Sequence, residues 1–257
     1  MTLRPVLLLA RRSVVGRFRH PSLFLPDLVG PILFTTVLWG SFSRTTTLPA
    51  FPDVRSFLDF AVVGAVVIGV CFSATDVADD LHADIADGFF DRLVVSPVPR
   101  SALVLGRLAG AAVFAAFESL AIMGVLSAFG ASIRGGLASV AVISVAAMIL
   151  AVGTGGLGAN LALRRGLAER ASAMFVPFAF MALFLSSAYF PRSVMDGWFK
   201  VVADVNPVSW VIEDLRHQVT VGFDAASAAQ AMGMVLLLAV VGVWSAVGAV
   251  RSRAEAP

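Results

Sequence analysis

Long apolar stretches separated by short polar ones run along almost the whole chain. Each stretch holds roughly 20 residues, the number that an α-helix needs to cross the hydrocarbon core of a bilayer. The pattern predicts an all-α membrane protein with six transmembrane helices, and we expect residues 1–257 to form a single domain. The predicted spans are residues 22–43, 57–75, 102–128, 137–163, 171–190 and 228–250.

The residues before the first predicted span follow a different pattern. Residues 3–19 place apolar side chains on one helical face, while most of their arginines lie off that face. The apolar core of this segment is too short for a signal peptide. We therefore expect an amphipathic helix in the membrane interface, with its arginines near anionic headgroups. The alternative is that these residues simply begin the first span.

The longest polar interval in the first half of the chain runs from Asp84 to Gly106, between the second and third spans. Pro97 and Pro99 should break the helix and stiffen the turn, because proline fixes φ and lacks a backbone donor. We expect this rigid loop to lie in the cytoplasm and to receive a push from a partner protein. Four aspartates before and at the start of this interval should share one face of a helix that continues the second span: Asp76, Asp80, Asp84 and Asp87.

Residues 191–227, between the fifth and sixth spans, contain two short apolar helical pieces. These are Trp198–Val202 and Val208–Leu215, which Asn206 and Pro207 separate. Each piece is too short to cross a bilayer, so the pattern favours re-entrant or interfacial helices that dip into the outer leaflet. An ordinary folded loop is the alternative.

Composition agrees with a membrane location, and charge gives the chain an orientation. Hydrophobic residues make up 58% of the chain and charged residues 14%, and the mean hydropathy is +0.89. Basic residues favour the cytoplasmic segments of membrane proteins. Of the 19 lysines and arginines, thirteen lie in segments that we place inside and six in outer segments, so we expect both termini in the cytoplasm. The net charge of +2 gives no support to nucleic-acid binding.

One glycine motif in the fourth span invites a nucleotide-binding interpretation. Gly153, Gly155 and Gly158 match the G-x-G-x-x-G pattern, but they lie inside an apolar run and follow no strand, so close helix packing explains them better. The sequence has no G-x-x-x-x-G-K-[ST] motif, so we expect this chain to bind no ATP and no other cofactor. The lone Cys71 and the scattered histidines suggest no metal site: His20, His82 and His217.

Glu118 is the most unusual side chain of the third span. It lies about 21 Å along that helix, where a carboxylate is costly and is by default a candidate for function. The alternative is a structural role, in which Glu118 is protonated or pairs with a polar neighbour such as Asn160. Both interpretations stay open.

Two stretches resemble type-2 ABC transporter permeases, especially the daunorubicin-resistance group. The first is the loop Asp87–Arg100 followed by Gly106 and Arg107. The second comprises Ser186–Pro191 and then Asn206–Arg216. Together with the six-span plan and the amphipathic N-terminal helix, the resemblance covers nearly the whole chain.

The resemblance implies a permease without its own ATPase. Such a permease pairs with a second permease copy, identical or related, and with two ATP-binding subunits that use ATP and Mg²⁺. Residues 3–20 would be a connecting helix, residues 84–100 the coupling loop, and residues 191–227 the outer re-entrant segment. The coupling residues would be Asp87, Gly88, Arg92, Ser96, Pro97, Pro99 and Arg100. The substrate pathway would run between the two permeases, lined by spans two and five, and we assign to it Glu118, Asn160, Ser186 and Ser187. The outer motif would be Asn206, Pro207 and Arg216.

We therefore expect a non-catalytic, multi-pass subunit of an ATP-driven exporter in the plasma membrane. Its substrate would be hydrophobic or amphipathic, such as a drug, antibiotic, lipid or glycan, and the exporter could confer drug or antibiotic resistance. The alternative is a non-transporting membrane protein, such as an assembly or immunity protein. Association with an ATP-binding subunit separates these two hypotheses. An intramembrane enzyme is disfavoured, since we find no catalytic constellation in the sequence.

Overall fold

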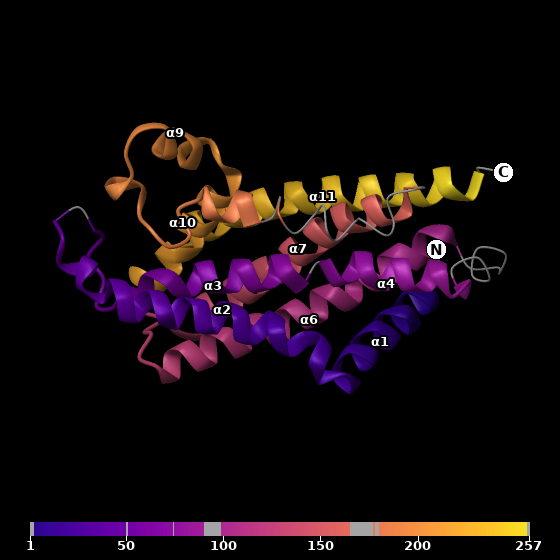
Figure 1. Ribbon diagram of the computed structural model, residues 1–257, viewed down its shortest axis with the longest axis horizontal. Helices are drawn as coiled ribbons and strands as arrows, with labels where there is room; N and C mark the ends of the chain where they lie inside the picture. Colours follow the sequence, from indigo (N-terminus) through magenta and orange to yellow (C-terminus); the bar gives the residue numbers. More distant parts are fainter. Residues whose placement is uncertain are drawn as a thin grey trace.

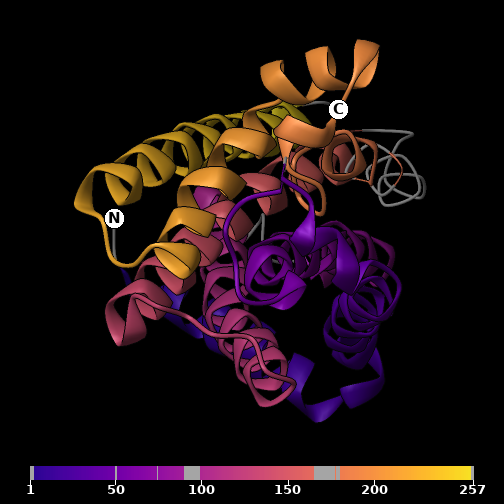
Figure 2. The same cartoon turned by 90° about the vertical axis from the view of Figure 1, so that its left-hand side faces the viewer.

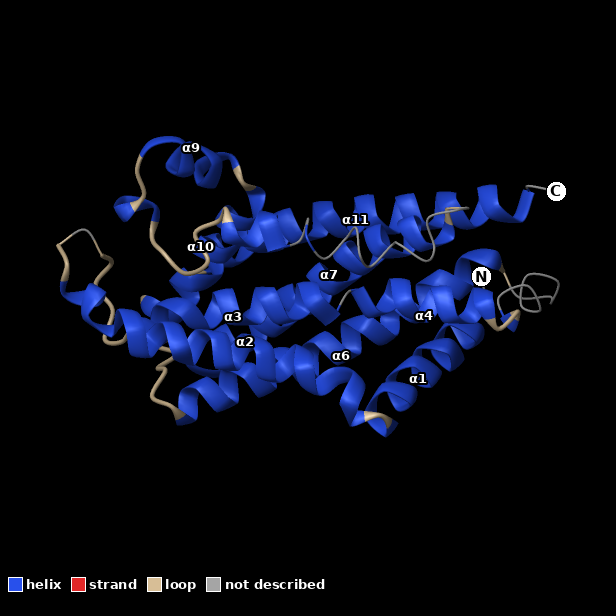
Figure 3. Ribbon diagram, viewed as in Figure 1, coloured by secondary structure: helices blue, strands red, loops and turns tan. Residues whose placement is uncertain are grey.

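The protein is an elongated bundle of helices, as the computed structural model in Figure 1 shows. The structure describes residues 3–49, 51–73, 75–89, 99–164, 177 and 180–255. All regular elements within these ranges are helical (Figure 3). The two ends of the chain lie at the same end of the bundle, beside helix α4 (Thr75–Ala86), and helices α9 (Gly197–Val205) and α10 (Pro207–Thr220) lie toward the other end (Figure 1).

Five helices within the described ranges are long and apolar enough to cross a membrane. They correspond to α2 (Pro21–Phe42) with η1 (Ser43–Thr47), α3 (Phe57–Ser73) with α4, α6 (Arg100–Ala128), α7 (Gly136–Leu163) and α11 (Ala225–Glu255). These helices confirm five of the predicted spans. Most of the predicted fifth span, residues 171–190, lies outside the described residues, so the count of six stays a prediction.

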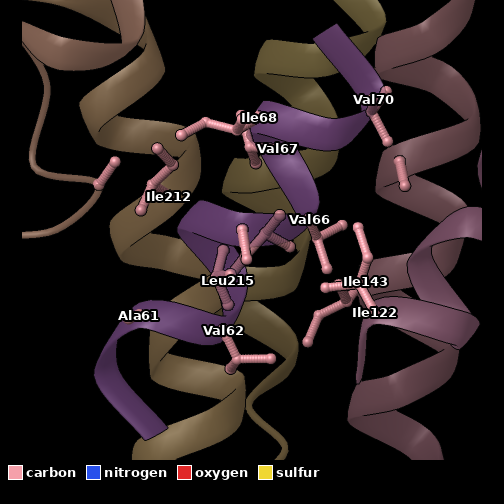
Figure 4. Close-up of a cluster of buried hydrophobic side chains, with 14 of the residues drawn as sticks. Ala61, Val62, Val66, Val67, Ile68, Val70, Ile122, Ile143, Ile212 and Leu215 are labelled. Carbon is pink, nitrogen blue, oxygen red and sulfur yellow. The ribbon is translucent and has the colours of Figure 1, made fainter. Parts of the chain in front are cut away.

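Helix α3 forms the centre of the bundle. Its residues from Phe57 to Val70 are buried on every side, which fits a helix that is hydrophobic all round. In Figure 4, valines of α3 lie between Ile212 on α10 and Ile143 on α7. Its own neighbours in the chain therefore cover α3 over most of its length.

Glycines allow α7 and α11 to cross closely. A Cβ atom added at Gly156 would lie 2.5 Å from the carbonyl carbon of Gly242, and one at Gly153 would lie 2.8 Å from Leu238. Close backbone approach of this kind is how helices associate in lipid, where apolar side chains gain little by leaving the solvent. The glycine motif of the fourth span is therefore a packing motif, as the sequence indicates.

Helix α1 (Leu3–Arg19) confirms the predicted N-terminal helix, and it packs along α6. Gly106 and Gly110 make room for it, since a Cβ at Gly106 would lie 2.5 Å from the Cβ of Leu9. Leu3 and Leu7 on another face are exposed, which suits a helix that rests in the membrane interface.

The predicted outer pieces form two helices, α9 and α10, after a short turn, η3 (Arg192–Val194). Pro207 is the first residue of α10, a position where its missing N–H costs nothing. Asn206 caps the helix, because its Oδ1 accepts a hydrogen bond from Val208 N at 2.9 Å. Helix α10 packs on α3, whereas α9 lies at the edge of the bundle (Figure 1 and Figure 2). A re-entrant position of these helices in a membrane stays a prediction.

Candidate functional site

The predicted coupling loop lies between the end of α4 at Ala86 and the start of α6 at Arg100. Gly88 has a left-handed φ of +65° two residues after the end of α4 at Ala86, a position that favours glycine. Pro99 precedes α6, and its carbonyl accepts a hydrogen bond from Ala102 N at 2.8 Å. Asp87 follows α4 directly. The other assigned coupling residues, Arg92, Ser96, Pro97 and the side chain of Arg100, lie outside the described residues.

A network of charges lies beside this loop, where α1, α2, α4 and α6 meet. Arg107 on α6 pairs with Asp80 at 2.8 Å and also with Asp84. From α1, Arg12 reaches Asp84 at 3.4 Å. We call this set, together with the pairs of Arg17 described next, the Asp–Arg ladder: Arg12, Arg17, Arg107, Asp27, Asp76, Asp80 and Asp84. Three of the four aspartates of the predicted acidic face therefore lie on α4 and face arginines of the same chain, whereas the fourth, Asp87, follows the end of the helix.

Arg17 is a largely enclosed member of the ladder, with 12% of its side chain exposed. It bonds Asp27 of α2 at 3.2 Å and pairs with Asp76 of α4. Its guanidinium also lies 4.0 Å from the centre of the Phe114 ring on α6. Burial lowers the pKa of Arg17, and the negative charges of Asp27 and Glu118 oppose that effect. One arginine therefore connects the N-terminal helix to three other helices.

The expectation that the arginines of the N-terminal helix lie near headgroups needs a correction for Arg17, which is enclosed by Asp27, Asp76 and Phe114. Arg12 also has partners within the chain, although 53% of its side chain is exposed. That side chain pairs with Asp84 and lies over the ring of Phe89, 4.1 Å from its centre. Arg4, Arg11 and Arg19 are exposed and stay available to headgroups. The i,i+4 spacing of the aspartates was the sequence signal for this network, but the sequence did not identify the arginines as their partners.

Glu118 lies in the core, against the central helix. Its side chain is fully buried on α6, and a Cβ atom added at Gly69 of α3 would lie 2.6 Å from its Oε1. The glycine thus makes room for the carboxylate. Glu118 therefore packs directly against the central helix α3.

Asn160 lies elsewhere and has a different environment. Its Nδ2 donates to the carbonyl of Ser245 at 3.0 Å, and its Oδ1 accepts from Arg164 Nε at 2.8 Å. The residue next to Glu118, Ser119, bonds Ser144 of α7, and Asn160 is about 24 Å farther along that helix. The structure therefore does not bring Glu118 and Asn160 together.

The residues of the outer motif gather in one buried cluster. Arg216 donates from Nε to the carbonyl of Phe60 at 2.9 Å, and from one terminal nitrogen to the carbonyls of Ser187 and Ala188 at 2.6 and 2.9 Å. Its guanidinium lies 3.6 Å from the centre of the Phe60 ring. Asn206 donates to the carbonyls of Ala182 and Leu185. We call this cluster, which joins α3, α10 and residues 182–188, the outer hub.

Ser186 and Ser187 belong to the outer hub rather than to an open surface. Both are buried. Ser186 Oγ donates to the carbonyl of Leu183 at 2.5 Å, and the backbone N–H of Ser187 donates to Ser209 Oγ at 3.1 Å. Their contacts are those of residues that hold a turn, and their assignment to a substrate pathway stays a prediction.

A pocket of about 220 Å³ opens between α2, α3 and residues 180–184. Phe180 and Phe184 stack with their ring centres 5.1 Å apart, and Phe72 approaches Phe180 at 5.0 Å. The lining is almost wholly apolar, so the pocket suits a flat or aliphatic group. We call it the aromatic pocket, and it is lined by Gly30, Pro31, Phe34, Ile68, Phe72, Phe180, Leu183 and Phe184.

Sequence reasoning missed the aromatic pocket. Phe180 and Phe184 are one helical turn apart, which is the signal that could have been noticed. Phenylalanine is frequent in the spans of this chain, however, so its presence alone does not separate a lipid-facing ring from a ring in a pocket. In the part of the chain that the structure describes, no group of three or more metal-binding side chains comes together.

Comparison with known proteins gives a family for this architecture. Residues 4–219 match the sequence profile described as ABC-2 type transporter. The daunorubicin resistance ABC transporter permease protein DrrB1 of Streptomyces coeruleorubidus is 25% identical over 190 residues. That match covers 73% of this chain and 64% of the relative, so it spans less than two thirds of the relative's length.

Two further relatives come from algae. The putative transport permease ycf38 of Porphyra purpurea is 26% identical over 215 residues, which cover 81% of this chain and 72% of the relative. The protein of the same name from Pyropia yezoensis is 24% identical over 212 residues, with the same coverage. Since the family match extends over most of a chain that has several membrane-length helices, this multi-pass membrane protein belongs to the ABC-2 type transporter family.

Proposed function

We propose that this chain is the permease subunit of an ATP-driven exporter in the cell membrane. It moves a hydrophobic or amphipathic substrate out of the cell, and a separate ATP-binding subunit supplies the energy with ATP and Mg²⁺. Family membership supports this proposal, because ABC-2 permeases normally work with such a subunit. The relative named for daunorubicin resistance favours a drug among the possible substrates.

The aromatic pocket is the observation that carries the substrate part of the proposal. It lies where span two meets the residues at the end of the predicted fifth span, the two elements that the family resemblance assigns to the pathway. Phe34, Phe180 and Phe184 are partly exposed, so the pocket opens at the surface of the chain. A second permease copy placed against this face would enclose the pocket and complete the pathway.

The Asp–Arg ladder supports the coupling part of the proposal. Four helices meet in it directly beside the ends of the coupling loop, so a displacement of the loop reaches α1, α2 and α6 together. Phe114 extends this connection, because the Arg17 guanidinium lies 4.0 Å from the centre of its ring on α6. The ladder thus gives the loop a mechanical path to the spans around the aromatic pocket.

Alanine substitutions test the pocket. We expect Phe72→Ala and Phe184→Ala to weaken binding of a transported compound by roughly tenfold or more, since a lost aromatic contact costs about 1.5–3 kcal/mol. The control is Phe129→Ala, because Phe129 is exposed at the far end of α6. Binding is measured by fluorescence titration of the purified protein with a panel that includes daunorubicin, a phospholipid and a glycan. Equal affinities for all three variants and the wild type would exclude the pocket.

A further inference from the structure

A second and larger groove, with a volume of about 1070 Å³, runs along α11 and meets the end of α7 at Asn160 and Arg164. It shares no lining residue with the aromatic pocket. Its walls are mostly apolar and include Leu236, Ala239, Val240, Val243 and Trp244. The stretch of α11 from Leu236 to Arg251 is about 22 Å long, which is close to the thickness of one leaflet with its headgroup layer.

Two arginines lie at one end of this groove, the end at which both chain termini are found. Arg164 and Arg251 line the groove and are exposed. Asn160 orients Arg164 by accepting its Nε–H, so the terminal nitrogens of that guanidinium remain for another partner. The groove therefore has one apolar end and one positively charged end.

The groove arginines differ from four arginines elsewhere in the molecule that form ion pairs. Arg12, Arg17, Arg107 and Arg192 each pair with at least one carboxylate. Within the described ranges, neither Arg164 nor Arg251 has a carboxylate within salt-bridge distance. Two exposed positive charges at the end of an apolar groove are complementary to an amphiphile with an anionic head.

We propose that this groove binds one anionic phospholipid from the leaflet on the side of the chain termini. The acyl chains lie along α11 beside Val240 and Trp244, and the phosphate contacts Arg164 and Arg251. Basic pockets between helices at the membrane surface bind anionic headgroups in this way, each arginine contributing through charge and hydrogen bonds. The lipid would fix the inner ends of α7 and α11 relative to each other.

Charge removal gives the first test. Purified protein in detergent is titrated with phosphatidylglycerol or with phosphatidylcholine of the same acyl chains, and bound lipid is counted by native mass spectrometry. We expect phosphatidylglycerol to bind at least about tenfold more tightly, and the double variant Arg164→Gln/Arg251→Gln to lose this preference. The matched control is Arg44→Gln/Arg134→Gln, which removes the same charge from exposed residues outside the groove.

Blocking the groove gives a second test that leaves both arginines in place. Gly248 lines the groove three residues before Arg251, and a Cβ atom there would meet nothing within 4 Å. Gly248→Phe should therefore fold normally and reduce phosphatidylglycerol binding about tenfold. Gly124→Phe is the control, since Gly124 is an exposed helical glycine of α6 with equally open surroundings.

Three results would overturn the proposal. Phosphatidylcholine could bind as tightly as phosphatidylglycerol, which would mean that the arginines recognise no charge. Both arginine double variants could lose lipid equally, which would mean that net charge rather than the groove is responsible. Gly248→Phe could change the oligomeric state while retaining the lipid, which would mean that the groove receives a second copy of the chain.

Discussion

Arg216 shows how one residue fixes the outer part of the molecule. Its guanidinium bonds three backbone carbonyls from two separate segments and lies over the Phe60 ring. Those carbonyls are buried, so a shorter or differently shaped side chain leaves some of them without a donor. A planar guanidinium can serve several acceptors at once, which an ammonium group cannot do with the same geometry.

We predict that Arg216→Lys destabilises the protein although it keeps the charge. The loss should be about 1–3 kcal/mol, the cost of leaving a buried acceptor unsatisfied. Thermal unfolding in detergent measures the effect, with Arg134→Lys as the control because Arg134 is exposed. If the two variants unfold at the same temperature, Arg216 does not hold the outer hub together.

Glu118 is the second residue whose position makes a specific prediction. Glu118→Gln keeps the shape of the side chain and removes its charge. We expect transport to fall about tenfold or more while the free energy of unfolding changes by less than about 1 kcal/mol, because a carboxylate in a span is usually kept for function. Transport at the wild-type rate would leave only the structural interpretation.

Gly69 offers an independent test of the same site. Gly69→Ala places a methyl group where the carboxylate of Glu118 now lies, so we expect it to displace that carboxylate and to reduce transport. Gly124→Ala adds the same methyl group in open space and should leave transport unchanged. Equal transport by the two variants would mean that the position of the carboxylate is unimportant.

Among the helices, α1 and α4 depend most on charged contacts. Helix α1 is amphipathic and its outer leucines are largely exposed, so its position relies on its packing on α6 and on the Asp–Arg ladder. Helix α4 continues the central span and presents its aspartates to both α1 and α6. A motion of the coupling loop must therefore move these three helices together or break ion pairs.

We predict that Arg107→Gln uncouples these helices. The substitution removes the ion pairs that Arg107 of α6 forms with Asp80 and Asp84 of α4. The loss of these charge-assisted bonds should cost about 1.5–3 kcal/mol. In a complex with the ATP-binding subunit, substrate should no longer stimulate ATP hydrolysis. The control is Arg11→Gln, which removes an exposed charge of α1. Stimulation and stability equal to those of the control would exclude the ladder as the connection.

The elements differ in how far the sequence could predict them. Spans such as Gly136–Leu163 agree with the expected 137–163 because bilayer thickness sets the length of an apolar helix. The caps of α10 were readable because Asn206 and Pro207 act locally. The partners of the α4 aspartates were not readable, since they come from α1 and α6 and depend on how whole helices pack. The aromatic pocket was hidden for the same reason.

At the scale of the whole molecule, the positions of the chain termini agree with the orientation in the membrane that the basic residues predict. Both termini and α4 lie at one end of the bundle, while α9 and α10 lie toward the other (Figure 1). The proposed inner segments also hold most of the basic residues. From the distribution of basic residues we predict that the coupling loop and both termini lie in the cytoplasm and the outer hub outside.

Site-directed labelling tests this orientation. We predict that single cysteines at Ser96 and Asp204, introduced in a Cys71→Ala background, react with a membrane-impermeant reagent from opposite sides of the membrane. Cys71 is buried, so its replacement removes the only native thiol without changing the surface. Reaction of both cysteines from the same side would contradict the topology.

Export coupled to a separate ATPase through the loop at residues 84–100 is the central claim, and ATP-driven uptake into inside-out vesicles tests it most directly. The vesicles contain this chain with its ATP-binding subunit, and the wild type is compared with a variant in which Gly-Ser-Gly-Ser replaces Val94-Val95-Ser96-Pro97. We predict ATP-dependent accumulation of substrate by the wild type and none by the variant, although the variant still inserts into the membrane. Full accumulation by the variant, with normal association of the ATP-binding subunit, would contradict the account.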